Sequence, residues 1–178
     1  MRVLFACTRG AGHFHPMVPF IEACRRGGHE VLVVAPPGVA ETVERAGYPF
    51  AGGAAPPEEE LGPVWARVPT LSYDEAERLV IGEIFATLNV RAMLPGMRAA
   101  VREWRPDVIL REPAEFASAV VAEEEGVAHV QIGIGLAVSQ MQMMSLATEA
   151  VETWGVGSDG ADRGHAVPDA LPGGARGS

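Results

Sequence analysis

Residues 8–20, TRGAGHFHPMVPF, decide the fold predicted for this chain. They follow a short apolar run, residues 3–7 (VLFAC), which is typical of a buried parallel strand. They lead into an amphipathic segment that begins near Pro16 and ends at residues 27–28, a glycine pair, as expected of a helix with proline in its first turn. This order places His13 at the carboxyl end of the first strand, the edge at which open α/β sheets bind ligands.

The rest of the sequence alternates short apolar runs with helical patterns. Further strands are expected at residues 30–35, 48–51, 107–110 and 127–132, and further helices at residues 39–46, 74–104 and 116–125. Because β-α-β crossovers are right-handed, these elements predict an α/β fold with a Rossmann-like parallel sheet and helices on both faces. The expected strand order is 3-2-1-4-5.

Proline and glycine mark the expected irregular segments. Residues 52–72 hold four prolines and the acidic triplet Glu58–Glu60, and we expect a long surface loop with a solvated acidic face. Pro95 is expected to kink or split the long helix. From residue 155 onward, seven of 24 residues are glycine and no periodicity remains. We therefore expect one domain over residues 1–154 and a glycine-rich linker or disordered tail over residues 155–178.

Charge and composition exclude several classes of function. The chain has 14 basic residues, all of them arginine, against 23 acidic ones, and a formal net charge of −9. An acidic chain without a basic stripe is not expected to bind nucleic acid, because phosphate neutralisation supplies most of that affinity. The lack of lysine in this sequence excludes P-loop phosphate binding and Schiff-base chemistry within it.

The cysteines and the apolar segments indicate the compartment. Cys7 and Cys24 lack C-x-x-C spacing and are expected to be buried, reduced thiols. The N-terminal apolar run is shorter than the roughly 7–15 residues of a secretory signal. No window approaches the ~18 apolar residues of a membrane span. A cytoplasmic protein without a membrane span is expected.

The expected strand order brings two chemical groups together. Strands one and four are neighbours at the point where the order reverses, so His13 and the pair Arg111-Glu112 are expected to meet over one crevice. A carboxylate that accepts from one imidazole nitrogen leaves the other nitrogen free to take a proton from a hydroxyl. The alternative is that His13 only caps its helix and that Glu112 pairs with Arg111 at the surface.

Two other interpretations of the glycine-bearing turn are disfavoured. Residues 10–15 (GAGHFH) match the first two glycines of G-x-G-x-x-G but carry His15 at the third position. The second strand ends in residues 35–37 (APP), without an acidic residue to bind a ribose. A metal site built on His13 and His15 lacks a third ligand at a suitable spacing. We therefore expect no cofactor and no metal.

The turn at residues 12–16 (GHFHP) resembles the G-H-x-x-P motif near the N-terminus of GT-B-fold, UDP-glycosyltransferase-like enzymes. It is most similar to bacterial members that glycosylate macrolides, polyketides and similar natural products. Residues 105–132 look like the fourth strand, the following helix and the fifth strand of that family, and the resemblance covers about residues 1–155. It implies the acceptor-binding half of a GT-B fold, with His13 as the base. Glu112 stands where the family usually has its partner aspartate.

The resemblance also implies a reaction and its partners. Such enzymes transfer a sugar from a nucleotide sugar to a hydroxyl of a hydrophobic small molecule, with inversion and without a metal. The donor is bound mainly by a second half whose histidine- and glycine-rich motif does not occur in this sequence, so the chain alone is expected to be inactive or nearly so. Acceptor contacts are expected from Gly12, Phe14, Phe85, Met141 and Met144.

Two further expectations follow from the same resemblance. The face toward the second half should expose apolar side chains at residues 141–144 and around Trp65. The alternative function, from a different class, is a non-catalytic small-molecule-binding or partner-docking module derived from such an enzyme.

Overall fold

A computed structural model describes residues 1–135 and 137–156. Within these residues, five strands form one parallel sheet in the order β3-β2-β1-β4-β5. The strands are β1 (Arg2–Ala6), β2 (Glu30–Ala35), β3 (Phe50–Gly52), β4 (Val108–Arg111) and β5 (Ala128–Gln131). The predicted α/β fold and strand order are confirmed. The expected tail, apart from residues 155–156, lies outside the described residues.

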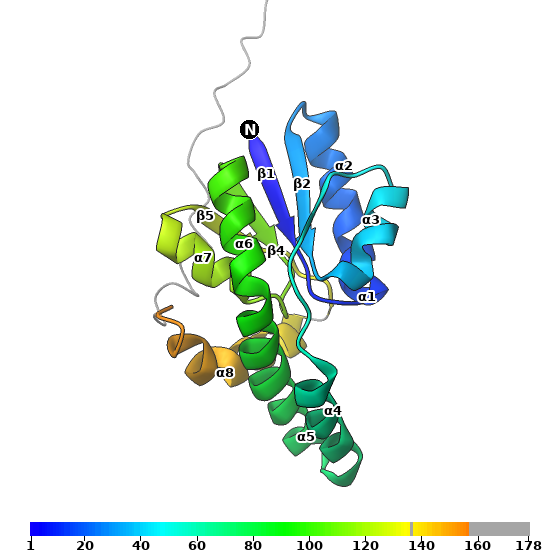
Figure 1. The fold of residues 1–178 in the computed structure, drawn as a ribbon, viewed down its shortest axis with the longest axis vertical. Helices are drawn as coiled ribbons and strands as arrows, with labels where there is room; N and C mark the ends of the chain where they lie inside the picture. Colours follow the sequence, from blue (N-terminus) through cyan, green and yellow to red (C-terminus); the bar gives the residue numbers. More distant parts are fainter. Residues whose placement is uncertain (136, 157–178) are drawn as a thin grey trace, which may run out of the picture.

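Helices cover both faces of the sheet (Figure 1). One face carries α1 (Ala11–Phe14), η1 (His15–Met17), α2 (Val18–Arg26), η2 (Pro37–Val39) and α3 (Ala40–Arg45). The other face carries α6 (Val90–Trp104) and α7 (Ala117–Glu125). The remaining helices are α4 (Glu58–Arg67), η3 (Val68–Thr70), α5 (Tyr73–Leu79), η4 (Val80–Asn89) and α8 (Ala137–Glu152). The α4–α5 region extends past the carboxyl ends of the strands, where α8 packs against η4 (Figure 1).

Alternating side chains of the strands supply two separate cores. In β1, Leu4 and Ala6 join the cluster under α6 and α7, whereas Val3 and Phe5 join the cluster under α2 and α3. Both faces of β1 are therefore apolar, which explains why its sequence is a continuous hydrophobic run. Cys7 continues this alternation and is a buried free thiol, as predicted, while Cys24 is free and only partly buried.

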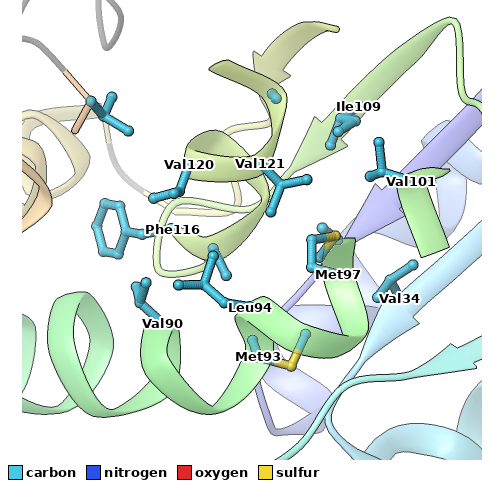
Figure 2. Packing of buried hydrophobic residues seen from close by; sticks show 14 of the residues in the cluster. Val34, Val90, Met93, Leu94, Met97, Val101, Ile109, Phe116, Val120 and Val121 are labelled. Carbon is cyan, nitrogen blue, oxygen red and sulfur yellow. The ribbon is translucent and has the colours of Figure 1, made fainter. Parts of the chain in front are cut away.

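The long helix fills the first of these cores. Figure 2 shows Leu94 and Met97 of α6 packed toward Val120 and Val121 of α7. These α6 side chains are at most 4% exposed, so this half of the helix is fixed against the sheet.

The first helical run begins earlier than predicted. It starts at Ala11 rather than near Pro16, because Gly10 adopts a φ of +119° and turns the chain directly from β1 into α1. The backbone N–H of His13 donates to the Gly10 carbonyl over 3.1 Å. His13 therefore lies in a helical turn fixed to the end of β1, not in an open loop.

The prediction of a long loop over residues 52–72 is wrong, because α4 forms inside it. Pro57 precedes the helix and the triplet Glu58–Glu60 occupies its first turn, where acidic side chains complement the positive end of the helix dipole. Ion pairs tie α4 to the long helix, between Arg67 and Glu83 at 3.0 Å and between Glu60 and Arg91. The acidic triplet is thus a helix-start signal.

The predicted long helix is present and is not split by Pro95. Residues Tyr73–Trp104 form one helical run of 32 residues, with π-helical turns over Val80–Asn89. Packing of Leu94 and Met97 in the core stabilises the helix on both sides of the proline. By length and composition alone this run could cross a membrane, which the sequence analysis did not anticipate. Its buried face belongs to the core, so it carries no argument for a membrane span.

Gly96 provides a test of how α6 is packed on β3. A Cβ at this position would lie 2.6 Å from the Gly52 carbonyl oxygen and 2.8 Å from the Cα of Gly53. Gly96→Ala should therefore lower the free energy of unfolding by about 1–3 kcal/mol, measured by chemical denaturation. Gly82→Ala is the control, because its Cβ would meet nothing within 4 Å and alanine favours the helix. An equal loss in both variants would contradict the close-approach explanation.

Candidate functional site

The structure brings His13 and Glu112 together at the switch point. His13 follows β1 and Glu112 follows β4, and these two strands pair directly. The His13 Nδ1 lies 3.2 Å from Glu112 Oε2. Although the two atoms do not meet the full angular requirements of a hydrogen bond, such pairs are often poorly aligned before substrate binds. The expectation that these residues, nearly a hundred positions apart, lie side by side is confirmed by this distance.

The Glu112 carboxylate is fully buried and held by backbone donors. Its Oε1 accepts from the Thr8 N–H at 3.0 Å, and its Oε2 accepts from the Ala114 N–H at 2.7 Å. Two neutral donors and the imidazole thus replace the water that this charge would otherwise keep. The carboxylate is therefore a fixed partner for His13.

The contact with Glu112 changes the titration of His13. It raises the pKa of the imidazole above 6.5, and burial of the ring opposes it in part. The side chain of His13 is 27% exposed while its Nδ1 is buried, so the exposed part is the remainder of the ring. One nitrogen faces the carboxylate, and the opposite edge is accessible. This is the arrangement that a general base toward a hydroxyl requires.

Arg111 is predicted to lie just beyond the fourth strand, and this prediction is wrong. Arg111 is the last residue of β4 and is 2% exposed. Its Nη1 donates to the Glu115 carbonyl at 3.3 Å, and its guanidinium lies 5.7 Å from the centre of the Phe116 ring. Burial lowers the pKa of Arg111, and the carboxylates of Glu115 and Glu112 oppose this shift. The alternative in which Arg111 and Glu112 form a surface pair is therefore wrong.

The predicted acceptor residues are only partly gathered around His13. The Phe85 ring from η4 meets the His13 ring edge to face, with the centroids 6.1 Å apart. Gly12 is exposed and has open space at its Cβ position. Phe14 is 1% exposed and packs near Tyr48 in the core under α2 and α3, so it offers no surface to a ligand.

The two predicted methionines of α8 differ from each other. Met141 is 74% exposed, whereas Met144 is partly buried against the core, with its sulfur 4.0 Å from Arg111 Nη2. Trp65 of α4 is 45% exposed. Apolar exposure is therefore found at Met141 and Trp65, two of the expected places.

An open groove of about 660 Å³ lies between the α5–η4 helix and α8. Charged and hydroxyl side chains, among them Arg78, Glu83 and Glu149, form much of its wall. Its lining contains neither His13 nor any predicted acceptor residue. In residues 1–135 and 137–156, no group of three or more His, Cys, Asp or Glu side chains is placed to hold a metal ion.

Sequence reasoning missed three residues of the site. Thr8 supports Glu112 through its backbone, and Asn89 of η4 donates to the Thr8 hydroxyl over 3.1 Å. Glu115 is 3% exposed and accepts from the N–H groups of Ala117 and Ser118, which begin α7. A signal existed for Asn89, because it is the only asparagine of the chain and interrupts an apolar helix.

Because the pKa of His13 is raised in the folded protein, the stability of the fold should depend on pH. Because the folded-state pKa exceeds the unfolded value of 6.5, the contribution of this contact to stability is complete below pH 6.5 and is lost as pH rises through the folded pKa. Glu112→Gln should lower the pKa of His13, measured by NMR titration of the imidazole, and remove this pH dependence. Glu124→Gln, which breaks a surface pair with Arg98, is the control and should leave His13 unchanged. An unshifted His13 in Glu112→Gln would contradict the contact.

Comparison with known proteins identifies relatives of this chain. The chain is 37% identical over 154 residues to L-demethylnoviosyl transferase of Streptomyces niveus, covering 85% of this chain and 39% of that protein. It is 31% identical over 151 residues to tylactone mycaminosyltransferase of Streptomyces fradiae, covering 74% of this chain and 33% of that protein. The chain thus spans little more than a third of the length of these relatives.

Solved structures share the fold. The spinosyn rhamnosyltransferase SpnG, complexed with spinosyn aglycone, superposes with a TM-score of 0.69 at 24% identity, covering 87% of this chain and 41% of that one. The same protein complexed with thymidine diphosphate gives a TM-score of 0.68. The sheet and helices described above therefore have the fold of one half of a GT-B protein.

A family model matches most of the chain. It is described as the erythromycin biosynthesis protein CIII-like, N-terminal domain, and it matches residues 22–153. The match includes Glu112 and η4 and begins after His13. The chain belongs to this family of EryCIII-like N-terminal domains.

Proposed function

We propose that this chain supplies the acceptor site and the general base of a glycosyltransferase acting on a hydrophobic natural product. The observation that carries this proposal is the 3.2 Å contact between His13 and the buried Glu112 carboxylate at the switch point. Sequence similarity to transferases of Streptomyces that are named for mycaminosyl and demethylnoviosyl groups supports the reaction class.

The chemistry follows from the two nitrogens of His13. Nδ1 faces Glu112, so the opposite nitrogen takes the proton of the acceptor hydroxyl. The hydroxyl oxygen then forms a bond to the anomeric carbon of the donor sugar, and the bond from that carbon to the nucleotide phosphate breaks. The leaving nucleotide keeps the electron pair, attack from the opposite side inverts the anomeric centre, and Glu112 stabilises the imidazolium that forms. In this scheme no metal takes part.

Apolar groups beside His13 are proposed to seat the acceptor. Phe85 lies against the imidazole. Met144, which lies near the buried Arg111, is proposed as a further contact at a greater distance along the acceptor. SpnG has been solved with spinosyn aglycone and with thymidine diphosphate, which supports an aglycone and a nucleotide sugar as the partners. The donor is assigned mainly to a second half, so this chain by itself is proposed to bind acceptor without turnover.

His13→Ala tests the assignment in a protein that joins residues 1–153 to the second half of L-demethylnoviosyl transferase. Loss of the base should reduce kcat by about 10²–10⁴-fold, measured as sugar transfer to an aglycone. Binding of the aglycone should survive and should still raise the melting temperature of the 178-residue chain. His15→Ala is the matched control, because this exposed histidine lies two residues away on the same turn.

Two results would contradict the proposal in different ways. Transfer that His13→Ala leaves intact would show that another group is the base. Aglycone binding without any transfer in the joined protein, under conditions where L-demethylnoviosyl transferase itself is active, would favour the non-catalytic binding module.

A further inference from the structure

A continuous set of contacts links the long helix to His13. Asn89 Nδ2 donates to the Thr8 hydroxyl at 3.1 Å, and the Thr8 N–H donates to Glu112 Oε1 at 3.0 Å. Glu112 Oε2 then faces His13 Nδ1 at 3.2 Å. Thr8 is 3% exposed and Glu112 is fully buried, so the contact between them is shielded from water, while the Asn89–Thr8 contact is partly buried.

The Thr8 N–H has a specific role in this set. The Ala114 N–H and His13 both meet Oε2, whereas Oε1 accepts from the Thr8 N–H. A carboxylate held on both oxygens cannot rotate about its terminal bond, whereas one held on a single oxygen can. The position of Thr8 therefore determines whether Oε2 remains directed at His13.

Asn89 is well placed to fix Thr8. It ends the π-helical segment η4, a type of helix that is rare and often found at functional sites. Phe85, four residues earlier in the same segment, contacts the His13 ring. One short segment thus touches both members of the pair, His13 directly and Glu112 through Thr8.

We propose that Asn89 is a positioning residue for the His13–Glu112 pair, acting through Thr8 to hold the Glu112 carboxylate against the imidazole. This inference rests on the proposed function of His13 as a base. It assigns to η4 a second task besides seating the acceptor, because a ligand that contacts Phe85 contacts the segment that aligns the base.

The charged groups around His13 decide which variants can test this proposal through the pKa of His13. Glu112, after β4, is the acidic side chain in contact with His13, and Phe85 of η4 presents an apolar ring. Arg111 and Glu115 lie behind Glu112 in the same loop and are buried. A variant at Asn89 that adds no charge leaves all of these groups in place.

The experiment is NMR titration of the His13 imidazole in the 178-residue chain. Asn89→Leu should lower the pKa of His13, by less than Glu112→Gln does, because Oε2 is no longer held in place. Thr87→Val is the matched control: it removes the hydrogen bond from the Thr87 hydroxyl to the Gly82 carbonyl in the same π segment and should leave His13 unchanged.

Thr8→Val covers the case in which Asn89→Leu does not fold. It removes the hydroxyl that Asn89 donates to, keeps the backbone N–H, and should produce the same fall in pKa. A wild-type titration in the folded Asn89→Leu or Thr8→Val variant would overturn the proposal, as would an equal fall in Thr87→Val. The titration requires no sugar transfer, so a failure of the proposed function would leave this result standing, and the reverse also holds.

Discussion

The structure depends on one buried charge, the carboxylate of Glu112. A carboxylate with no exposed surface is costly unless its oxygens are satisfied, and here the donors come from Thr8, Ala114 and His13. Thr8 and His13 follow β1, while Ala114 follows β4. The charge is therefore satisfied only when these two strands are close, so the same interaction that defines the candidate site also favours the observed pairing of β1 with β4.

The same interaction connects stability to chemistry. The carboxylate raises the pKa of His13, and partial burial of the ring limits that effect, so the imidazole is a stronger base than a free one and keeps an accessible edge. A base of this kind is useful only with a partner that remains in place, and the backbone donors supply that rigidity without adding charge. Asn89 links Thr8 to the helix that also carries Phe85, so the imidazole, its carboxylate partner and the Phe85 ring belong to one connected set of contacts.

Much of the fold could be predicted from patterns that are local in the sequence. Continuous apolar runs marked the strands, and glycines in left-handed conformation at residues 28 and 126 end helices as expected. The meeting of His13 and Glu112 could also be predicted, because it depends on topology alone. Other features depend on tertiary packing. The burial of Arg111, the direction of Phe14 and the π-helical turns before Asn89 have no sequence period of their own, and α4 was obscured by its prolines and acidic triplet.

The most direct test of the account is a crystal structure of this chain with a bound natural-product aglycone. The account predicts that a hydroxyl oxygen of the ligand lies about 2.6–3.2 Å from the nitrogen of His13 that faces away from Glu112, with the ligand in contact with Phe85. An aglycone bound in the groove between α5 and α8, with no hydroxyl near His13, would contradict it.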